Sequence, residues 1–174
     1  MSVIVQNCDV LYITTERISL IEAALRETEG RDIFLVVNLN ELLLNILAFD
    51  PVLLRRTAAR ANVLLMNDAE STKALKMLGR GSWSRAWATS LAELVITAGT
   101  SGGRVSTAPF AVWHPYSALP TERPACPVGA GDTFNGTYLV ARFLEGRSVQ
   151  DSCLRAAEAA SRKVELRRSS LMVG

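Results

Sequence analysis

Histidine and cysteine are scarce in this chain, whose 174 residues include one histidine and three cysteines. Cys8, Cys126 and Cys153 are odd in number and lack the spacing of metal ligands, so they indicate reduced thiols. His114 lies in a loop pattern and is interpreted as a polar surface residue. The scarcity argues against a disulfide framework or a cysteine-based metal site, and it predicts a cytoplasmic protein.

Long apolar runs and a strong charge bias are also absent. No stretch approaches the roughly 18 uninterrupted apolar residues of a membrane span, and the first residues lack a signal-peptide pattern. The net charge of +2 favours neither nucleic acid nor a membrane surface as a partner. The length predicts a single domain over residues 1–174. With 49% apolar and only 21% charged residues, the chain is expected to have further protein against one face.

Buried strands alternate with helices along the chain, and this alternation predicts an α/β protein. A mainly parallel sheet covered on both faces follows from it, as a three-layer α/β/α sandwich. Strands are expected at residues 10–14, 33–37, 63–66 and 94–97, and helices at 19–29, 50–60, 68–78, 85–92, 131–144 and 149–166. Residues 104–106 and 110–113 are expected to form an antiparallel ribbon, and residues 114–127 a loop.

Several polar residues mark where these elements begin and end. Asp50 is the expected N-cap of one helix, with Pro51 at its first position, and Ser148 is the expected N-cap of the last helix. Asn38, Asn67 and Thr97 each stand at the end of a predicted strand. Because parallel sheets bind ligands at the carboxyl ends of their strands, these three positions predict a site at that edge.

Residues 128–136 (VGAGDTFNG) join two glycines, a carboxylate and the start of a helical pattern. Glycine lets the backbone approach a ligand closely, and a helix beginning here would direct its free N–H groups and positive dipole end at an anion. This combination is typical of a phosphate-binding loop. A carboxylate beside a phosphate is repulsive unless it takes part in the chemistry, so Asp132 is a candidate general base. The alternative is an ordinary glycine turn, with Asp132 merely favouring a helix N-terminus.

Three motifs in order resemble one family. Residues 129–132 (GAGD) resemble the signature of the ribokinase-like carbohydrate kinases, the PfkB family. Residues 67–70 (NDAE) match that family's N-x-x-E motif, and residues 97–102 (TAGTSG) match its T-x-G-x-x-G nucleotide segment. The order and spacing agree over roughly residues 60–165. Three ordered motifs are far more specific than one.

The resemblance implies an ATP- and Mg²⁺-dependent kinase of a small sugar or sugar acid. It assigns catalysis to Asp132 as base with Gly129, Ala130 and Gly131, nucleotide binding to Asn67, Thr97, Gly99 and Gly102, and the magnesium site to Glu70. Each motif keeps an ordinary structural alternative. Asn67 and Glu70 are also spaced as a helix capping box, and residues 97–103 also suit a strand-to-hairpin turn.

Two departures from the family pattern are visible. Asn38 stands where many members carry the acid of an Asp-x-Asn pair, although Asn40 is retained and would still reach the phosphates. Residues 126–128 (CPV) replace an Asp-Thr-Thr segment whose aspartate helps to bind a monovalent cation. A thiol is a poor potassium ligand, so activation by potassium in the family's usual way is not expected.

The early part of the family pattern is missing: no sugar-binding Gly-Gly motif and no substrate lid precede the three motifs. The chain therefore looks like the C-terminal nucleotide-binding and catalytic half of a kinase. A second hypothesis is a truncated, non-catalytic remnant that binds nucleotide or a partner. Either way, self-association or a partner over the truncated sheet is expected. A dinucleotide-binding module is disfavoured, because Phe134 occupies the place of the third glycine of G-x-G-x-x-G.

Overall fold

A computed structural model describes residues 8–14, 17–83, 91–107, 112–119 and 128–171. The chain divides into two compact units. The strand–helix unit comprises Met1–Ile96 and Ser106–Val112, and the pocket unit comprises Thr97–Val105 and Trp113–Gly174. The sequence prediction of one domain over residues 1–174 stays a prediction.

The strand–helix unit is built on four neighbouring strands in the order of the sequence: β1 (Val10–Ile13), β2 (Phe34–Asn38), β3 (Val63–Asn67) and β4 (Glu93–Thr97). Strands β1, β2 and β3 are parallel, with Val10 opposite Phe34 and Val36 opposite Val63. Most of the side chains of β2, β3 and β4 are buried, as their unbroken apolar runs predict for a sheet covered on both faces. The expected α/β architecture with a mainly parallel sheet is confirmed.

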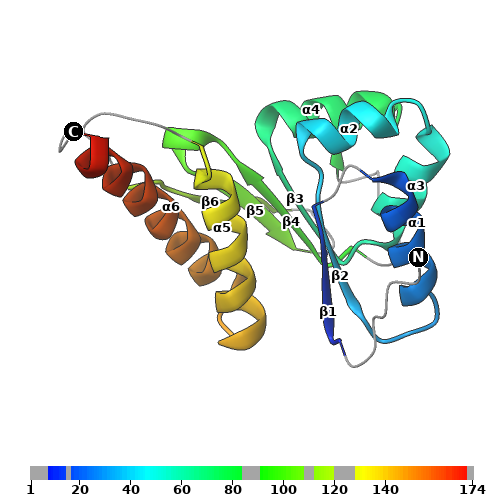
Figure 1. The fold of residues 1–174 in the computed structure, drawn as a ribbon, viewed down its shortest axis with the longest axis horizontal. Coiled ribbons are helices and arrows are strands. Elements are labelled where there is room, and N and C mark those ends of the chain that lie inside the picture. The colour runs from blue at the N-terminus through cyan, green and yellow to red at the C-terminus, as the bar shows by residue number, and fades with distance from the viewer. Residues whose placement is uncertain (1–7, 15–16, 84–90, 108–111, 120–127, 172–174) are drawn as a thin grey trace. The chain divides into compact units, whose positions relative to one another are not determined.

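Four helices connect these strands: α1 (Ile18–Thr28), α2 (Glu41–Leu47), α3 (Pro51–Arg60) and α4 (Asp68–Met77). They lie on one side of the strands (Figure 1), as right-handed crossovers between consecutive parallel neighbours require. Asp50 caps α3 by accepting the Leu53 N–H at 2.8 Å, as predicted.

Helix α2 was not predicted from the sequence, where residues 38–40 appear only as the loop that follows a strand. Asn40 is its N-cap and accepts the Leu43 N–H at 2.9 Å. The buried face of the helix consists of Leu43, Leu44 and Leu47, spaced three and four apart. An asparagine followed by this spacing was the available signal.

Strands β5 (Gly103–Thr107) and β6 (His114–Tyr116) form an antiparallel pair, with Gly103 opposite Tyr116 and Val105 opposite His114. The second strand of the ribbon was expected at residues 110–113 and His114 in a loop, and the structure corrects both. Gly102 permits this register, because a side chain there would overlap the backbone of Tyr116 and Ala118. Residues 108–111 lie outside the described residues, and so does the 85–90 part of the helix expected at 85–92, while residues 91–92 are not helical.

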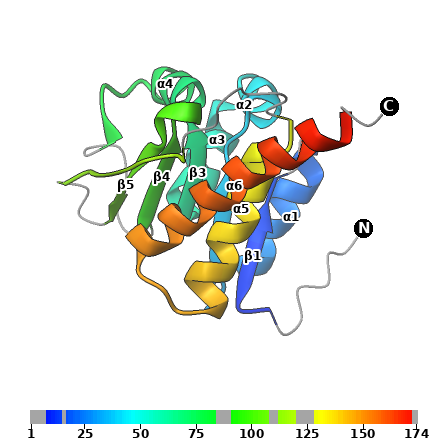
Figure 2. The same ribbon diagram turned by 90° about the vertical axis from the view of Figure 1, so that its left-hand side faces the viewer.

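Two long helices complete the pocket unit. Helix α5 (Ala130–Leu139) continues into a π-helical turn at Val140–Leu144, and α6 spans Val149–Leu171. The two helices pack along each other, α5 in yellow and α6 in orange to red in Figure 2. Helix α6 also packs against β6. Ser148 caps α6 by accepting the Asp151 N–H at 3.1 Å, as predicted.

A ladder of aromatic rings joins β6 to α5. Tyr116 stacks on Phe134 with ring centroids 5.7 Å apart, and Phe134 stacks on Tyr138 at 6.4 Å. All three side chains are nearly or fully buried. Offset ring stacking adds about 0.5–1.5 kcal/mol per pair beyond burial, so the ladder holds the first turns of α5 in a fixed place beside the hairpin.

Replacing Gly102 by alanine is expected to destabilise the chain severely. Gly102 has φ of 85°, and a Cβ there would lie 2.1 Å from the Tyr116 carbonyl oxygen and 2.7 Å from the Ala118 nitrogen. Because both obstacles are backbone atoms, we expect a loss of at least ~3 kcal/mol in the free energy of unfolding, measured in urea.

Gly146→Ala is the matched control in the same unit. Gly146 has φ of 65°, but nothing lies within 4 Å of its added Cβ. Only backbone strain remains there, at about 1–2 kcal/mol. Equal losses in the two variants would show that the close approach at Gly102 does not fix the hairpin.

Candidate functional site

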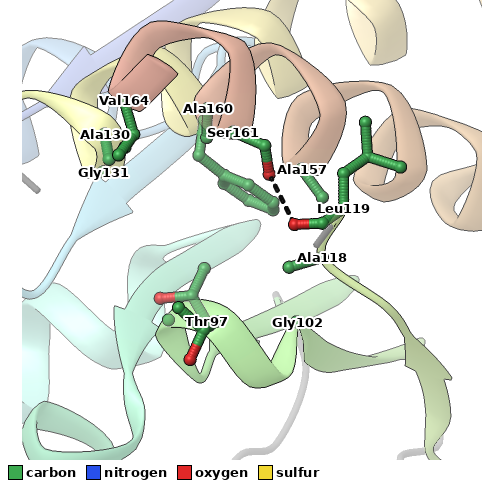
Figure 3. A pocket seen from close by; sticks show the side chains of 13 residues that line it. Thr97, Gly102, Ala118, Leu119, Ala130, Gly131, Ala157, Ala160, Ser161 and Val164 are labelled. Carbon is green, nitrogen blue, oxygen red and sulfur yellow. Dashed lines mark hydrogen bonds between the residues drawn. The ribbon is translucent and has the colours of Figure 1, made fainter. Parts of the chain in front are cut away.

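A cavity of about 180 Å³ opens within the pocket unit. Its wall comes from four segments: the turn after β4, the segment after β6, the first turns of α5 and one face of α6 (Figure 3). The lining residues are Thr97, Gly99, Thr100, Gly102, Ala118, Leu119, Ala130, Gly131, Phe134, Ala157, Ala160, Ser161 and Val164. Pockets that enclose a whole drug-sized ligand measure roughly 300–1,000 Å³, so this one suits a single ring system of a larger ligand.

The N-terminus of α5 forms one wall of the cavity. Gly129 is its N-cap and adopts the left-handed conformation, with φ of 82° and ψ of 0°. The hydroxyl of Thr133 donates to the Gly129 carbonyl at 2.8 Å, and the Thr133 N–H donates to the same oxygen at 2.9 Å. The N–H groups of Ala130 and Gly131 precede this first helical bond, so a phosphate or other anion can bind them.

Asp132 stands in that first turn, and its side chain is exposed. A carboxylate in the first turn is favoured by the helix dipole, which is the structural alternative that the sequence left open. Its exposure also leaves the carboxylate free to meet a hydroxyl group of a bound molecule. The position of Asp132 therefore suits both a role in stabilising the helix and a role as general base.

The opposite wall is a one-turn 3-10 helix, Gly99–Ser101, between β4 and β5. The Gly102 N–H donates to the Gly99 carbonyl at 3.1 Å, and the Ala98 N–H donates to the Gly102 carbonyl at 2.7 Å. The tight turn places Thr97, Thr100 and the two glycines along the cavity. The backbone of residues 97–103 thus forms the strand-to-hairpin turn that was the alternative interpretation of this motif. The same turn also forms a wall of the pocket.

Of the residues predicted from the sequence, the structure brings Thr97, Gly99, Gly102, Ala130 and Gly131 together around one cavity. Gly129 and Asp132 flank the last two in the chain. The sequence missed the contribution of α6, whose Ala157, Ala160, Ser161 and Val164 line the same cavity. Their spacing of three and four along a helix rich in alanine was the available signal.

Asn67 and Glu70 belong to the strand–helix unit, where they form a capping box at the start of α4. The Asn67 side chain accepts the Glu70 N–H at 2.8 Å, and the Glu70 carboxylate accepts the Asn67 N–H at 2.7 Å. The other carboxylate oxygen accepts the Glu41 N–H at 3.0 Å. Glu70 therefore ties the start of α4 to the start of α2. The capping alternative is present in the structure, and a role at a metal stays a prediction.

Burial raises the pKa of Glu70 above its ordinary value of 4.5, and it is the largest of the influences on that pKa. The N–H groups of Asn67 and Glu41 oppose this rise in the pKa, because they stabilise the charged form, and the charge of Glu41 adds to it. Each carboxylate oxygen keeps acceptor capacity beyond its backbone bond. The group can thus still accept a hydrogen bond from a water molecule.

The polar residues at the end of β2 are used locally. Asn38 is nearly buried, and its amide donates to the Thr14 hydroxyl at 3.4 Å. The amide of Asn40 donates to the same hydroxyl at 3.5 Å, while its oxygen caps α2. Asn38 and Asn67 are the last residues of β2 and β3, which are parallel neighbours, so both lie at the carboxyl end of these strands within the unit. The ligand site predicted there, together with Thr97, stays a prediction.

Two kinds of site are absent from the described part of the chain. No group of three or more His, Cys, Asp or Glu side chains there is arranged to hold a metal ion. None of its helices combines the length and apolar character needed to cross a bilayer. Cys126 and Pro127, at the position of the family's cation-binding segment, lie outside the described residues.

An α/β fold with a helix N-terminus at a pocket is an arrangement that can bind an anion, and comparison with known proteins gives the family. Residues 3–172 match the family described as "pfkB family carbohydrate kinase", so the chain belongs to the PfkB family. Comparison with the curated proteins finds no significant match.

Solved structures of the ribokinase family share the fold. A nucleoside kinase from Methanocaldococcus jannaschii is 19% identical with a TM-score of 0.78, and the match covers 91% of this chain and 50% of that one. A Burkholderia thailandensis nucleoside kinase in complex with inosine is 19% identical with a TM-score of 0.79, over 92% and 50%. An adenosine kinase from Anopheles gambiae is 21% identical with a TM-score of 0.72, over 91% and 51%. The chain thus spans about half the length of these proteins, and the predicted ribokinase-like fold is confirmed.

The raised pKa of Glu70 predicts a pH effect on stability. A carboxyl group that binds its proton more tightly when folded stabilises the fold below its unfolded pKa, and this contribution is lost as the pH rises through the folded pKa. The free energy of unfolding of the unaltered chain should therefore contain a component that falls as the pH rises from about 4.5. Glu70→Gln keeps a capping side chain and should remove that component.

Urea denaturation of both chains at a series of pH values measures this difference, and an NMR titration of the Glu70 carboxyl carbon measures the pKa directly. A titration midpoint at or below 4.5 would contradict the prediction, and so would parallel stability curves for the two chains.

Proposed function

We propose that this chain supplies the ATP-binding and phosphoryl-transferring half of a cytoplasmic kinase. Its acceptor would be a hydroxyl group of a small sugar or sugar acid, as in ribokinase or 2-keto-3-deoxygluconate kinase. The similar solved structures are nucleoside and adenosine kinases, so the acceptor class extends to the sugar of a nucleoside. Membership of the PfkB family supports kinase chemistry and leaves the acceptor open.

The observation that carries the proposal is the pocket that ends on the N-terminus of α5. Its walls are apolar and small, which suits a nucleotide base, and the free N–H groups of Ala130 and Gly131 suit phosphate oxygens. A structure of the Burkholderia thailandensis nucleoside kinase in complex with ADP-inosine has the same fold. It is 20% identical to this chain, with a TM-score of 0.79. This supports a nucleotide in the present pocket.

Asp132 is proposed as the base that accepts the proton of the attacking hydroxyl group. Phosphoryl transfer passes through a loose transition state, so orientation and charge neutralisation contribute more than base strength. The N–H groups at Ala130, Gly131 and Asp132 would hold the negative charge on the transferring group. Thr97, Gly99 and Gly102 would hold the nucleotide on the other wall.

Magnesium is the metal that the family implies, and the residues present fit it. Mg²⁺ keeps several waters and binds mainly to nucleotide phosphates with one or two protein carboxylates. Glu70, assisted by Asn67, is proposed to take part through water, because its oxygens keep acceptor capacity beyond their backbone bonds. When bound, the ion would neutralise charge on the phosphates.

A second candidate is a non-catalytic protein that binds nucleotide or a partner, and the specific observation in its favour is length. The chain spans about half of each similar kinase. For either candidate we propose self-association, or a partner that covers the sheet. In the described part of the chain, β1 ends the strand order, and an edge strand presents unpaired N–H and C=O groups.

Calorimetric titration with Mg-ATP tests the nucleotide site. The unaltered chain should bind, and Asp132→Asn should bind almost equally, because in the proposed mechanism the carboxylate would act on the acceptor hydroxyl and not hold the nucleotide. Where a partner or longer chain gives turnover, Asp132→Asn should slow it by about 10²–10⁴-fold, the usual contribution of a general base.

Asp151→Asn is the control, because Asp151 occupies the first turn of α6 and does not line the pocket. It should leave both binding and turnover unchanged. Absence of ATP binding at millimolar concentration would refute the nucleotide site, and full turnover by Asp132→Asn would refute the base.

The isolated chain is expected to associate and to show little sugar-dependent turnover. The residues that would orient an acceptor hydroxyl are not among the recognised motifs, and orientation accounts for much of the rate of such a reaction. Light scattering gives the mass, and a coupled ADP-release assay over sugars, sugar acids and nucleosides gives the activity. A monodisperse monomer with robust acceptor-dependent ADP release would contradict this prediction.

A further inference from the structure

The side chain of Thr133 is tied to the residue that begins α5. Its hydroxyl group donates to the Gly129 carbonyl at 2.8 Å, and the Thr133 N–H donates to the same oxygen at 2.9 Å. A backbone carbonyl oxygen has two lone pairs, and these two donors use both. One residue thereby holds the carbonyl group of the N-cap through two hydrogen bonds.

The Gly129 carbonyl and the Ala130 N–H belong to one peptide group. A trans peptide group is planar, so its C=O and N–H bonds point in opposite directions. The carbonyl points along α5 toward Thr133, and the N–H therefore points out of the N-terminus of the helix. Ala130 also lines the pocket. Whatever fixes the direction of the Gly129 carbonyl therefore fixes the direction of the Ala130 N–H as well.

Gly129 restrains this peptide group very little by itself. Its φ is 82° and its ψ is 0°, a left-handed conformation that glycine adopts about as readily as a right-handed one. Among the described residues, nothing lies within 4 Å of the place where a Cβ would stand, so packing on that side does not restrain Gly129. Rotation of the peptide group would turn a carbonyl oxygen, in place of an N–H group, toward a bound anion. The two bonds from Thr133 oppose that rotation.

Hydroxyl bonds of the same kind occur in two other helices of the described chain. The Thr72 hydroxyl donates to the Asp68 carbonyl at 2.9 Å in α4, and the Ser152 hydroxyl donates to the Ser148 carbonyl at 2.8 Å at the start of α6. Such bonds to the carbonyl four residues earlier are ordinary features of helices. Thr133 differs in its acceptor, which is a left-handed glycine at the pocket end of α5.

We propose that Thr133 is a positioning residue of the phosphate site, whose hydroxyl group holds the peptide group between Gly129 and Ala130 so that the Ala130 N–H faces the transferred phosphate. The inference rests on the nucleotide site proposed above. In this role Thr133 acts through the peptide group and not by contact with the nucleotide.

The strength of one hydrogen bond gives the size of the effect. Its net contribution corresponds to a factor of about 2–10 in an equilibrium constant. Loss of the hydroxyl group lowers the fraction of chains in which the Ala130 N–H faces the phosphate. The apparent dissociation constant rises as the inverse of that fraction, so the expected loss of affinity is about 2–10-fold.

Calorimetry with Mg-ATP and Mg-ADP tests the proposal on three chains: the unaltered one, Thr133→Val and Thr133→Ser. Valine keeps the shape of threonine and has a similar helix propensity, whereas serine keeps the hydroxyl group. Thr133→Val should bind Mg-ATP about 2–10-fold more weakly than the unaltered chain. It should bind Mg-ADP as well as the unaltered chain does, because ADP lacks the transferred phosphate. Thr133→Ser should restore the affinity for Mg-ATP.

The outcomes separate this inference from the nucleotide site. If the unaltered chain binds Mg-ATP and Thr133→Val binds it equally well, the inference is overturned and the nucleotide site stands. Equal weakening of Mg-ATP and Mg-ADP by Thr133→Val, or a Thr133→Ser chain as weak as Thr133→Val, would show a general structural role and would also overturn it. Binding of neither nucleotide by the unaltered chain would refute the site itself.

Thr72→Val is the matched control, because it removes the corresponding hydroxyl bond from α4. Thr72 is exposed and is not among the residues that line the pocket. Its substitution should leave the affinity for both nucleotides unchanged. A loss of Mg-ATP affinity equal to that of Thr133→Val would show that the peptide group at Gly129 is not the cause. Urea denaturation of each variant checks that its fold is retained.

Discussion

The approach of Gly102 to the neighbouring backbone is the contact on which the pocket unit depends. With no side chain, Gly102 lies against Tyr116 and Ala118 at distances that no Cβ would permit. The contact is compatible with Gly103 opposite Tyr116, and Tyr116 in turn stacks on Phe134 of α5. The absence of a side chain at Gly102 thereby permits the hairpin geometry in which Tyr116 stacks against the first turns of α5.

The N-terminus of α5 gives that pocket its chemical character. A left-handed glycine at the N-cap turns the chain abruptly into the helix, so that unpaired N–H groups lie on the cavity wall. Most of the other side chains that line the cavity are apolar, so these N–H groups are its main fixed positive partial charges among the described residues. The exposed Asp132 adds a carboxylate to the same first turn, and it is the group proposed above as the base.

The N-x-x-E motif shows how one residue can serve structure while remaining available for chemistry. Glu70 holds the starts of α4 and α2 together through two backbone N–H groups. Partial burial raises its pKa, and the same N–H groups counter that rise by stabilising the charge. A carboxylate fixed in this way loses little conformational freedom when it binds a hydrated ion. Its structural role therefore does not count against the role at a metal that the motif implies.

The sequence by itself determined the α/β class, the strand ends at Asn38 and Asn67, the cap at Asp50 and five of the residues that line the pocket. These are local features, because apolar periodicity, capping chemistry and glycine patterns act over a few residues. Helix α2 was not predicted, although Asn40 as an N-cap and the spacing of the leucines after it indicated a helix. The position of β6 and the part of α6 in the pocket were decided only by tertiary structure. A strand's register and a helix's neighbours depend on contacts between distant segments, such as Gly102 with Tyr116, which no local pattern records.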